Sequence, residues 1–376
     1  MVRVIEVGHL VAGPSAGLIF SDLGFEVIKI EEPNRGDTAR YFAGPSSGTF
    51  AYFNRNKKSL ALNLKHEKGK EVFFKLVKTA DILIDNLGFG TMNKLGLDYQ
   101  VLSQQNQKLI YLSIKGYAKG PYEKRNSLDF PIEVHSGIAY MTGLKNRPMR
   151  LGASIVDISA AMLGVILALK ALIEREKTGK GKYLEVGLFE TAILLVGQHI
   201  ASYQINNNKP LNPINEEGFA WGIYDFFETK DGYKIFIGVT TDSQWQKFCK
   251  ALNLSYCNDE RFSTNEKRYE MRDFLIPEIA KVIKEYKKDE LISLLSENNI
   301  SFAELNKPWD LINDIHAKKY MVPVLWKGKE IMVPKIVNES NLITDPPELG
   351  ENTEEILKEL GYNENDIDYL KREKVI

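Results

Sequence analysis

Residues 59–86, SLALNLKHEKGKEVFFKLVKTADILIDN, contain two short apolar segments on either side of a longer amphipathic one. Residues 59–64 alternate between small or polar side chains and leucine, which is typical of a strand. In residues 66–80 the apolar positions recur with the spacing of one helix face, and residues 81–86 form a second apolar strand. Two strands joined by a helix predict a parallel βαβ unit.

The same alternation extends to both sides of this unit. The sequence predicts strands at 2–7, 26–32 and 109–116, and a helix near 15–23. Residues 183–205 are predicted as a strand that continues into a helix. Repeated strand–helix units predict an α/β fold class, with a Rossmann-like, doubly wound parallel sheet in the large domain.

The pattern changes in the second half of the chain. Residues 224–239 predict a β-hairpin that turns at Lys230–Gly232, and helical segments follow at 243–252, 274–286 and 288–299. We therefore expect a large Rossmann-like domain at 1–200, a linker at 201–223, a small α+β domain at 224–320, and a C-terminal return to the large domain at 321–376.

Composition limits the classes of partner. The chain has 376 residues, 44% hydrophobic, and a formal charge of -1, which argues against nucleic-acid and membrane partners. Residues 155–172 are expected to form a buried helix rather than a membrane span. Two cysteines and five histidines indicate no disulfide framework and no metal site, which favours a reducing, cytoplasmic location.

Ligands of parallel α/β sheets bind at the carboxyl ends of the strands. The first such loop contains Gly8, Gly13 and Gly17, whose spacing does not match the dinucleotide fingerprint. Cations on the loops around the sheet could hold phosphate groups if they share one edge of it, although each alone is typical of a solvated surface. These cations are Arg40, Lys57, Lys58, Lys94 and Arg125.

Asp157 stands where an apolar strand-like segment becomes helical. Asp is a favoured N-cap residue, so a capping role explains it locally. The alternative is a partly desolvated nucleophile toward an activated acyl group, which requires an ionised carboxylate that the helix terminus would favour. The local sequence leaves both roles open.

Several stretches, in order, resemble the family III CoA-transferases, which include the formyl-CoA and carnitine CoA-transferases and the related α-methylacyl-CoA racemases. The stretches extend from the first loop to near the C-terminus. They are AGPSAGLIFSDLGFEVIKIEEPNRGDTAR (12–40), NRNKKSLALNLKHEKGKEVFFKLVKTADILIDN (54–86), MNKLGLDY (92–99), LSIKGYAKGPY (112–122), ASIVDISAAMLGVILAL (153–169), TGKGKYLEVGLFETA (178–192), FFETKDGYKIFIGVTTDSQWQKFC (226–249) and PPELGENTEEILKELGY (346–362).

The resemblance implies a catalytic role for Asp157. In these transferases the aspartate attacks an acyl-CoA thioester to give a mixed anhydride and then an aspartyl-CoA thioester, from which CoA passes to a carboxylic acid. Coenzyme A, as acyl-CoA, is then a substrate, and no metal is expected. The implied CoA contacts are Arg40, Lys57, Lys58, Asn86 and Lys94, to which the position of Arg125 adds a sixth. The resemblance also implies an interlocked homodimer.

Two alternatives remain. A racemase or epimerase would use two proton-transferring partners. The racemases have a histidine directly before the aspartate that corresponds to Asp129, and here Leu128 occupies that place. Their glutamate early in the small domain is replaced by threonine in GVTTDSQW (238–245). The sequence therefore favours a transferase, and a CoA-binding protein without catalysis is the other alternative.

Overall fold

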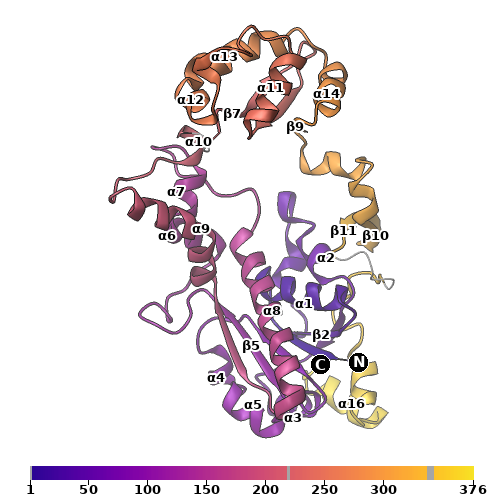
Figure 1. The fold of residues 1–376 in the computed structure, drawn as a ribbon. Coiled ribbons are helices and arrows are strands. Elements are labelled where there is room, and N and C mark those ends of the chain that lie inside the picture. The colour runs from indigo at the N-terminus through magenta and orange to yellow at the C-terminus, as the bar shows by residue number, and fades with distance from the viewer. Residues whose placement is uncertain (1, 218–220, 337–342) are drawn as a thin grey trace. The chain divides into compact units, whose positions relative to one another are not determined.

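The structure is a computed structural model that describes residues 2–217, 221–336 and 343–376. Its chain divides into two compact units (Figure 1). The first comprises the chain up to Tyr140, Pro148–Leu211 and Ile315–Ile376, and the second comprises Met141–Arg147 and Asn212–Asp314. The predicted linker at 201–223 starts too early, because helix α9 continues to Ile205. The inclusion of 141–147 in the second unit was not predicted.

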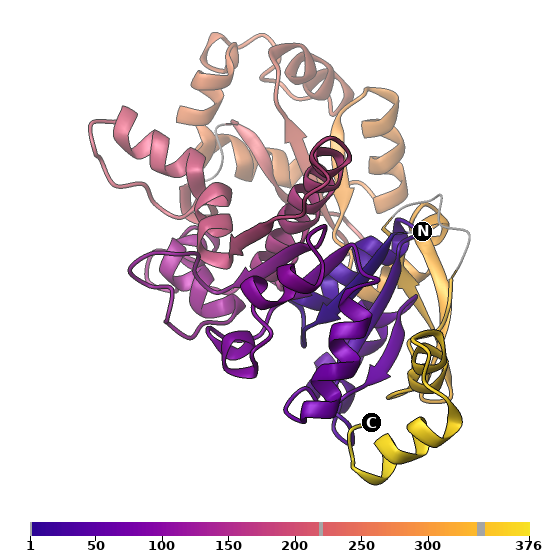
Figure 2. The same ribbon diagram turned by 90° about the horizontal axis from the view of Figure 1, so that it is seen from below.

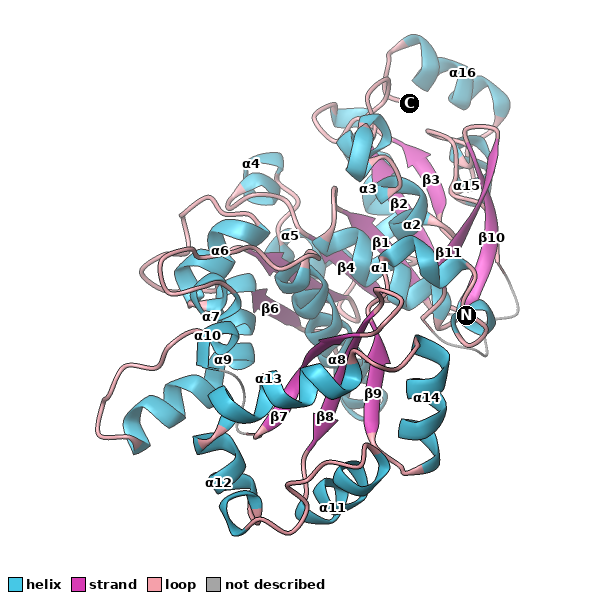
Figure 3. Cartoon of the chain, turned by 90° about the horizontal axis from the view of Figure 1, so that it is seen from above, coloured by secondary structure: helices cyan, strands magenta, loops and turns pink. Residues whose placement is uncertain are grey.

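A six-stranded parallel sheet forms the centre of the first unit, as Figure 3 shows in magenta. Its strand order is β3-β2-β1-β4-β5-β6, so the direction of winding reverses between β1 and β4. The predicted mixed α/β architecture with a parallel sheet is confirmed. The strands are β1 (Arg3–Val7), β2 (Glu26–Glu31), β3 (Lys58–Ala61), β4 (Ile82–Asp85), β5 (Ile110–Lys115) and β6 (Tyr183–Gly187).

Helices cover both faces of this sheet because successive strand residues point to opposite faces. Val4 and Ile82 pack with α1, α8 and α9 in one apolar core, whereas Ile5 and Leu83 pack with α3, α5, α15 and α16 in another. The helices of this unit are α1 (Ala12–Asp22), α2 (Thr49–Asn54), α3 (Glu67–Val77), α4 (Thr91–Leu95), α5 (Tyr99–Gln105), α6 (Asp129–Ser136), α7 (Ile138–Thr142), α8 (Ile155–Thr178), α9 (Leu188–Ile205), α15 (Thr353–Glu359) and α16 (Glu364–Arg372).

Helix α8 is only partly the buried helix that the sequence predicts. One stripe, including Val156 and Ala168, packs onto the sheet, while Ile166 and Ile173 are exposed in the single chain. Among the described helices α8 is also the one long and apolar enough to span a membrane by length and composition alone. The helix ends at Thr178, and the left-handed conformation of Gly179 (φ 69°) at its C-cap terminates it.

A hairpin of β10 (Met321–Trp326) and β11 (Lys329–Pro334) returns the chain to the first unit. Arg55 links this hairpin to the end of α1, where it forms a fully buried ion pair with Asp22. Arg55 also donates to the carbonyl of Pro334 at 2.9 Å. The C-terminal helices then lie beside the N-terminal part of the chain, as the yellow and purple segments in Figure 2 show.

The second unit contains a three-stranded antiparallel sheet in the order β7-β8-β9. The predicted hairpin at 224–239 is confirmed as the first two strands, and helices pack against them around Trp245 and Phe248. Its elements are α10 (Ile214–Glu217), β7 (Ile223–Glu228), β8 (Lys234–Val239), α11 (Asp242–Ala251), α12 (Asn265–Glu270), α13 (Arg272–Ile283), α14 (Lys288–Glu297) and β9 (Ser301–Glu304).

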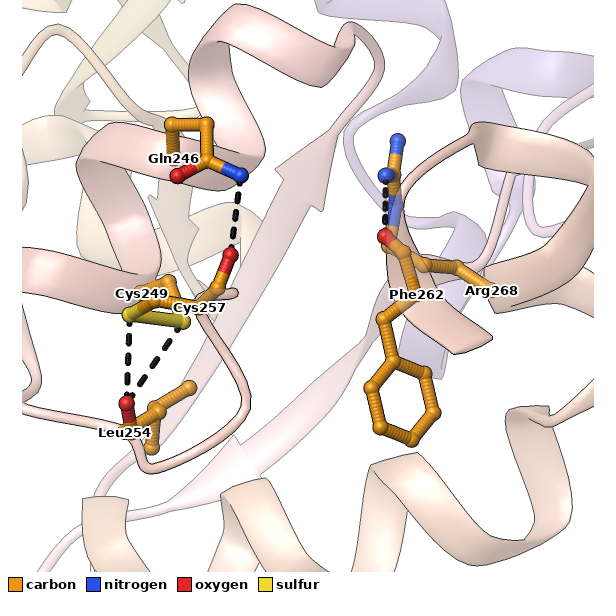
Figure 4. The surroundings of a disulfide bond; sticks show 6 residues. All are labelled: Gln246, Cys249, Leu254, Cys257, Phe262 and Arg268. Carbon is orange, nitrogen blue, oxygen red and sulfur yellow. Dashed lines mark hydrogen bonds between the residues drawn. A yellow bond between two sulfur atoms is a disulfide. The ribbon is translucent and has the colours of Figure 1, made fainter. Parts of the chain in front are cut away.

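Cys249 and Cys257 form a disulfide in this unit, so the expectation of no disulfide is wrong (Figure 4). The chain turns back after α11, and this brings the two Cα atoms to 5.4 Å, a usual separation for bridged cysteines. The spacing of two cysteines eight residues apart in the sequence does not indicate that the chain turns back between them. The cytoplasmic location therefore loses its argument from cysteine usage and stays a prediction.

Candidate active site

A cavity of about 450 Å³ lies where the winding of the sheet reverses, at the carboxyl ends of β1, β4 and β5. This is where open α/β sheets bind their ligands. The predicted residues Asn86, Arg125 and Asp157 all line it. The remaining lining residues are His9–Ala12, Leu87–Phe89, Ile114–Gly116, Glu123, Asn126–Leu128, Pro131 and Leu188.

Asp157 is not the N-cap of α8, which corrects the capping expectation. Ser154 occupies the N-cap position, and Asp157 lies in the first turn. The cap hydrogen bonds come from Asp129, whose Oδ1 accepts the N–H groups of Val156 at 3.0 Å and Asp157 at 3.2 Å. Because another carboxylate satisfies these donors, the side chain of Asp157 is left available to the cavity.

The electrostatic environment of Asp157 also differs from the expectation that the helix terminus would keep it ionised. Burial and then the charge of Asp129 raise the pKa of Asp157 to about 7, and Arg150 acts in the opposite direction. Within the described chain, the Asp157 carboxylate accepts no hydrogen bond. A carboxylate that is poorly solvated and only half ionised near neutral pH is a reactive acyl acceptor whenever it is ionised.

Asn86 fixes the loop that follows β1. Its side chain accepts the N–H of His9 at 2.9 Å and donates to the carbonyl of His9 at 3.2 Å. Gly8 and Gly13 lie so close that a Cβ atom on either would be 2.5 or 2.7 Å from Asn86 Oδ1. These two positions must therefore be glycine because the Asn86 side chain comes too close for a Cβ atom, and not because they bind a dinucleotide.

The remaining predicted cations divide into two groups. Arg125 is exposed on the wall of the cavity, and Lys94 is exposed on α4. Thr91 and Leu95 from the same helix line a second cavity of about 350 Å³ at the ends of β1, β2 and β3. Arg125 and Lys94 are therefore accessible near the carboxyl edge of the sheet.

Arg40, Lys57 and Lys58 are already paired with acids. Arg40 is buried, donates to Glu31 at 2.8 and 2.7 Å and stacks on the ring of Phe50. This occupies its guanidinium at the carboxyl end of β2.

Lys57 and Lys58 lie at the amino end of β3, so the expectation of one shared edge is wrong for them. A lysine that precedes a strand necessarily starts from the opposite edge. Lys57 is buried 2.6 Å from Glu6, and burial lowers its pKa to about 8. Lys58 pairs with Glu26 at 3.0 Å and with Glu355 at 2.7 Å.

Other charged residues near the site were missed. Lys115 lines the first cavity and Lys65 the second. Lys115 is the last residue of β5, and Lys65 lies shortly after the end of β3, so their positions at the carboxyl ends of strands could have identified them. Glu133 and Arg150 lie next to Asp129 behind the cavity, and no sequence pattern indicated them. Among the described residues, no cluster of His, Cys, Asp and Glu suitable for a metal ion is found.

Comparison with known proteins gives a consistent relationship. The family model described as CoA-transferase family III matches residues 1–353. The chain is 30% identical to the alpha subunit of succinyl-CoA–L-malate CoA-transferase from Chloroflexus aurantiacus, over 100% of this chain and 92% of that one. It is also 30% identical to mouse succinyl-CoA:glutarate CoA-transferase, over 98% and 88%.

A solved structure gives the same relationship. A CAIB/BAIF family protein from Brucella suis superimposes with a TM-score of 0.84 at 29% identity, over 96% of this chain and 98% of that one. The Chloroflexus and mouse relatives are both named as CoA-transferases, in agreement with CoA transfer as the general class of reaction. The chain therefore belongs to CoA-transferase family III.

Proposed function

We propose that the protein transfers CoA from an acyl-CoA donor to a carboxylic acid, with Asp157 as the nucleophile. The observation that carries this proposal is the Asp157 carboxylate, which lines the cavity and accepts no hydrogen bond within the described chain. Its pKa of about 7 leaves it partly ionised at neutral pH. The first turn of α8 presents it at the carboxyl edge of the sheet.

The proposed reaction has two halves. Asp157 attacks the thioester carbonyl, the C–S bond breaks, and an aspartyl anhydride and CoA thiolate form. The thiolate attacks the aspartyl carbonyl, which releases the donor acid and leaves an aspartyl-CoA thioester. The incoming carboxylate repeats these steps in reverse and restores Asp157. Dividing the exchange in this way replaces one difficult substitution by several acyl transfers.

CoA is proposed to bind along the carboxyl edge, with Asn86 holding the loop and Lys94 and Arg125 facing the phosphates. Arg125 is exposed and lines the first cavity, and Lys94 is exposed on the helix whose Thr91 and Leu95 line the second. Arg40, Lys57 and Lys58 are left out of the proposed contacts because acids already compensate their charges. Lys65 and Lys115 are added because they line the cavities and their acidic partners, Glu32 at 3.6 Å and Glu185 at 3.9 Å, are more distant.

The acid acceptor is proposed to be a dicarboxylic acid. The two relatives described above are named for malate and glutarate, with succinyl-CoA as partner. In this chain Arg125 and Lys115 line the same cavity as Asp157, so a second carboxylate would meet a cation there. Competition between dicarboxylic and monocarboxylic acids of equal length would test this assignment.

A homodimer is proposed as the active form. Helices α8 and α9 expose apolar side chains in the single chain, among them Ile166 at 62%, Leu194 at 70% and Ile205 at 80%. Large apolar surfaces on adjacent helices are usually covered in the functional assembly. A second copy of this chain is the occupant that the family resemblance implies.

The test of the nucleophile compares Asp157→Ala with Asp273→Ala. Asp273 is an exposed aspartate in the first turn of α13 and serves as the matched control. Asp157→Ala should lower CoA exchange from succinyl-CoA by at least about 10⁴-fold while CoA still binds. Hydroxylamine should trap an aspartyl adduct in the wild type only. Full exchange activity in Asp157→Ala would refute the proposal.

A further inference from the structure

Glu133 on α6 has a carboxyl oxygen without a hydrogen-bond partner in the described chain. Its side chain is fully buried. Oε2 accepts the N–H of Leu151 at 2.9 Å, but Oε1 has no partner. The guanidinium of Arg150, which is half exposed, lies 3.9 Å from Oε1. A buried, ionised carboxylate with so little compensation is costly, so this oxygen requires an explanation.

Asp129 lies one helical turn before Glu133 on the same face of α6 and is also buried. Its Oδ1 accepts the two N–H groups of α8, and its Oδ2 faces Arg150 at 3.4 Å. Both carboxyl groups face the guanidinium of Arg150, at 3.4 and 3.9 Å, and their spacing on α6 makes them neighbours. Ionised carboxylates can only accept, so a hydrogen bond between them requires one proton.

We propose that Glu133 and Asp129 share a single proton, held on Glu133, and that Glu133 is a positioning residue for Asp157. The proton belongs on Glu133 because both oxygens of Asp129 serve as acceptors. Protonated Glu133 donates from its unpartnered oxygen to Asp129, and Asp129 holds the first turn of α8. This inference rests on the nucleophilic role proposed for Asp157.

The charged groups around Glu133 agree with a neutral side chain. Asp129 faces it from α6, Arg150 from the segment before α8, and Asp157 lies beyond Asp129 on α8. On α9, which packs against α6, Glu190 accepts the N–H of Ala118 instead. Burial first, and then Asp129, raise the pKa of Glu133 to about 7, with Arg150 opposing. Two carboxyl groups therefore share one half-exposed cation.

The shared proton makes the rate depend on two ionisations with opposite requirements. Asp157 must lose its proton to attack, whereas Glu133 must keep its proton to hold Asp129. The proton on Glu133 stays in place through the reaction, while Asp157 alternates between carboxylate and acyl forms. The rate of CoA exchange by the wild type should therefore follow a narrow bell-shaped curve against pH. Its fall at alkaline pH should follow the loss of the proton from Glu133.

Infrared spectroscopy of the resting protein tests the proton without using activity. In Asp157→Asn, the carbonyl band of the protonated Glu133 carboxyl group should disappear as the pH is raised, with a midpoint near its pKa of about 7. The double variant Asp157→Asn/Glu133→Gln should lack this band. Asp85 is another buried acid with a raised pKa, and it contributes equally to both variants. Identical spectra for the two variants would overturn the proposal.

CoA exchange measured against pH tests the positioning role. Glu133→Gln keeps a neutral donor and should retain activity while losing the alkaline fall. Glu133→Ala loses the donor and should lower kcat about 100-fold with little change in KM. Glu190→Gln is the control and should keep the wild-type profile. An unchanged alkaline limb in Glu133→Gln would refute the inference. Activity in Asp157→Ala would refute the nucleophile but leave the infrared result standing.

Discussion

The nucleophilic step should depend steeply on pH because of the environment of Asp157. With a pKa of about 7, the ionised fraction of Asp157 is about one tenth at pH 6 and about nine tenths at pH 8. Where Glu133 does not titrate, as in Glu133→Gln, the rate of adduct formation should therefore rise about tenfold between pH 6 and pH 8. An aspartate with its ordinary pKa of 3.8 would be fully ionised at both pH 6 and pH 8, and the rate would stay constant.

The measurement uses a single turnover in the Glu133→Gln variant, in which the neighbouring carboxyl group no longer titrates. Enzyme is mixed with excess succinyl-CoA, quenched at successive times, and the aspartyl adduct is trapped with hydroxylamine. Asp157→Asn provides the blank at each pH. A rate that is flat from about pH 5.5 to 8 would show that burial and the charge of Asp129 do not govern this carboxylate.

Three further outcomes are expected. Asp22→Ala should lower the free energy of unfolding, measured by urea titration, by about 3–5 kcal/mol because it leaves the buried Arg55 unpaired. The control Glu71→Ala, which removes an exposed ion pair with Lys68, should lower it by less than about 1 kcal/mol. Asn86→Ala should raise KM for acyl-CoA about tenfold in initial-rate assays, since the loop after β1 loses both of its hydrogen bonds to this side chain, and an unchanged KM would contradict that role. Leu194→Glu should shift sedimentation toward the monomer, while Leu325→Glu, exposed on β10, should not.

The alternating pattern of the sequence predicted the central architecture because periodicity reports which faces of a segment are buried. The strands at 26–32 and 109–116 and the helix at 66–80 were found within a few residues of their predicted limits. Short helices of about two turns, such as α6, were not predicted. That omission mattered, because α6 carries the two carboxyl groups behind the site.

The candidate site was predicted less completely for a physical reason. Asp157 could be identified locally, but its cap partner Asp129 is 28 positions away, and no periodicity reports that contact. Lys57 was expected to contact CoA because of the family resemblance and as one of several cations on loops around the sheet. Its side chain instead reaches Glu6 in the interior. Long-range pairings of this kind depend on packing, which sequence patterns do not encode.

The C-terminal return has a consequence for biosynthesis. Ile367, Leu370 and Val375 pack into the same apolar core as Ile5, and the carbonyl of Val375 accepts the N–H of Asn63 at 2.8 Å. The part of this sheet face that α15 and α16 cover therefore stays open while the second unit is being translated, until these two helices have left the ribosome. A nascent chain stalled before α16 would expose that face to chaperones and to aggregation.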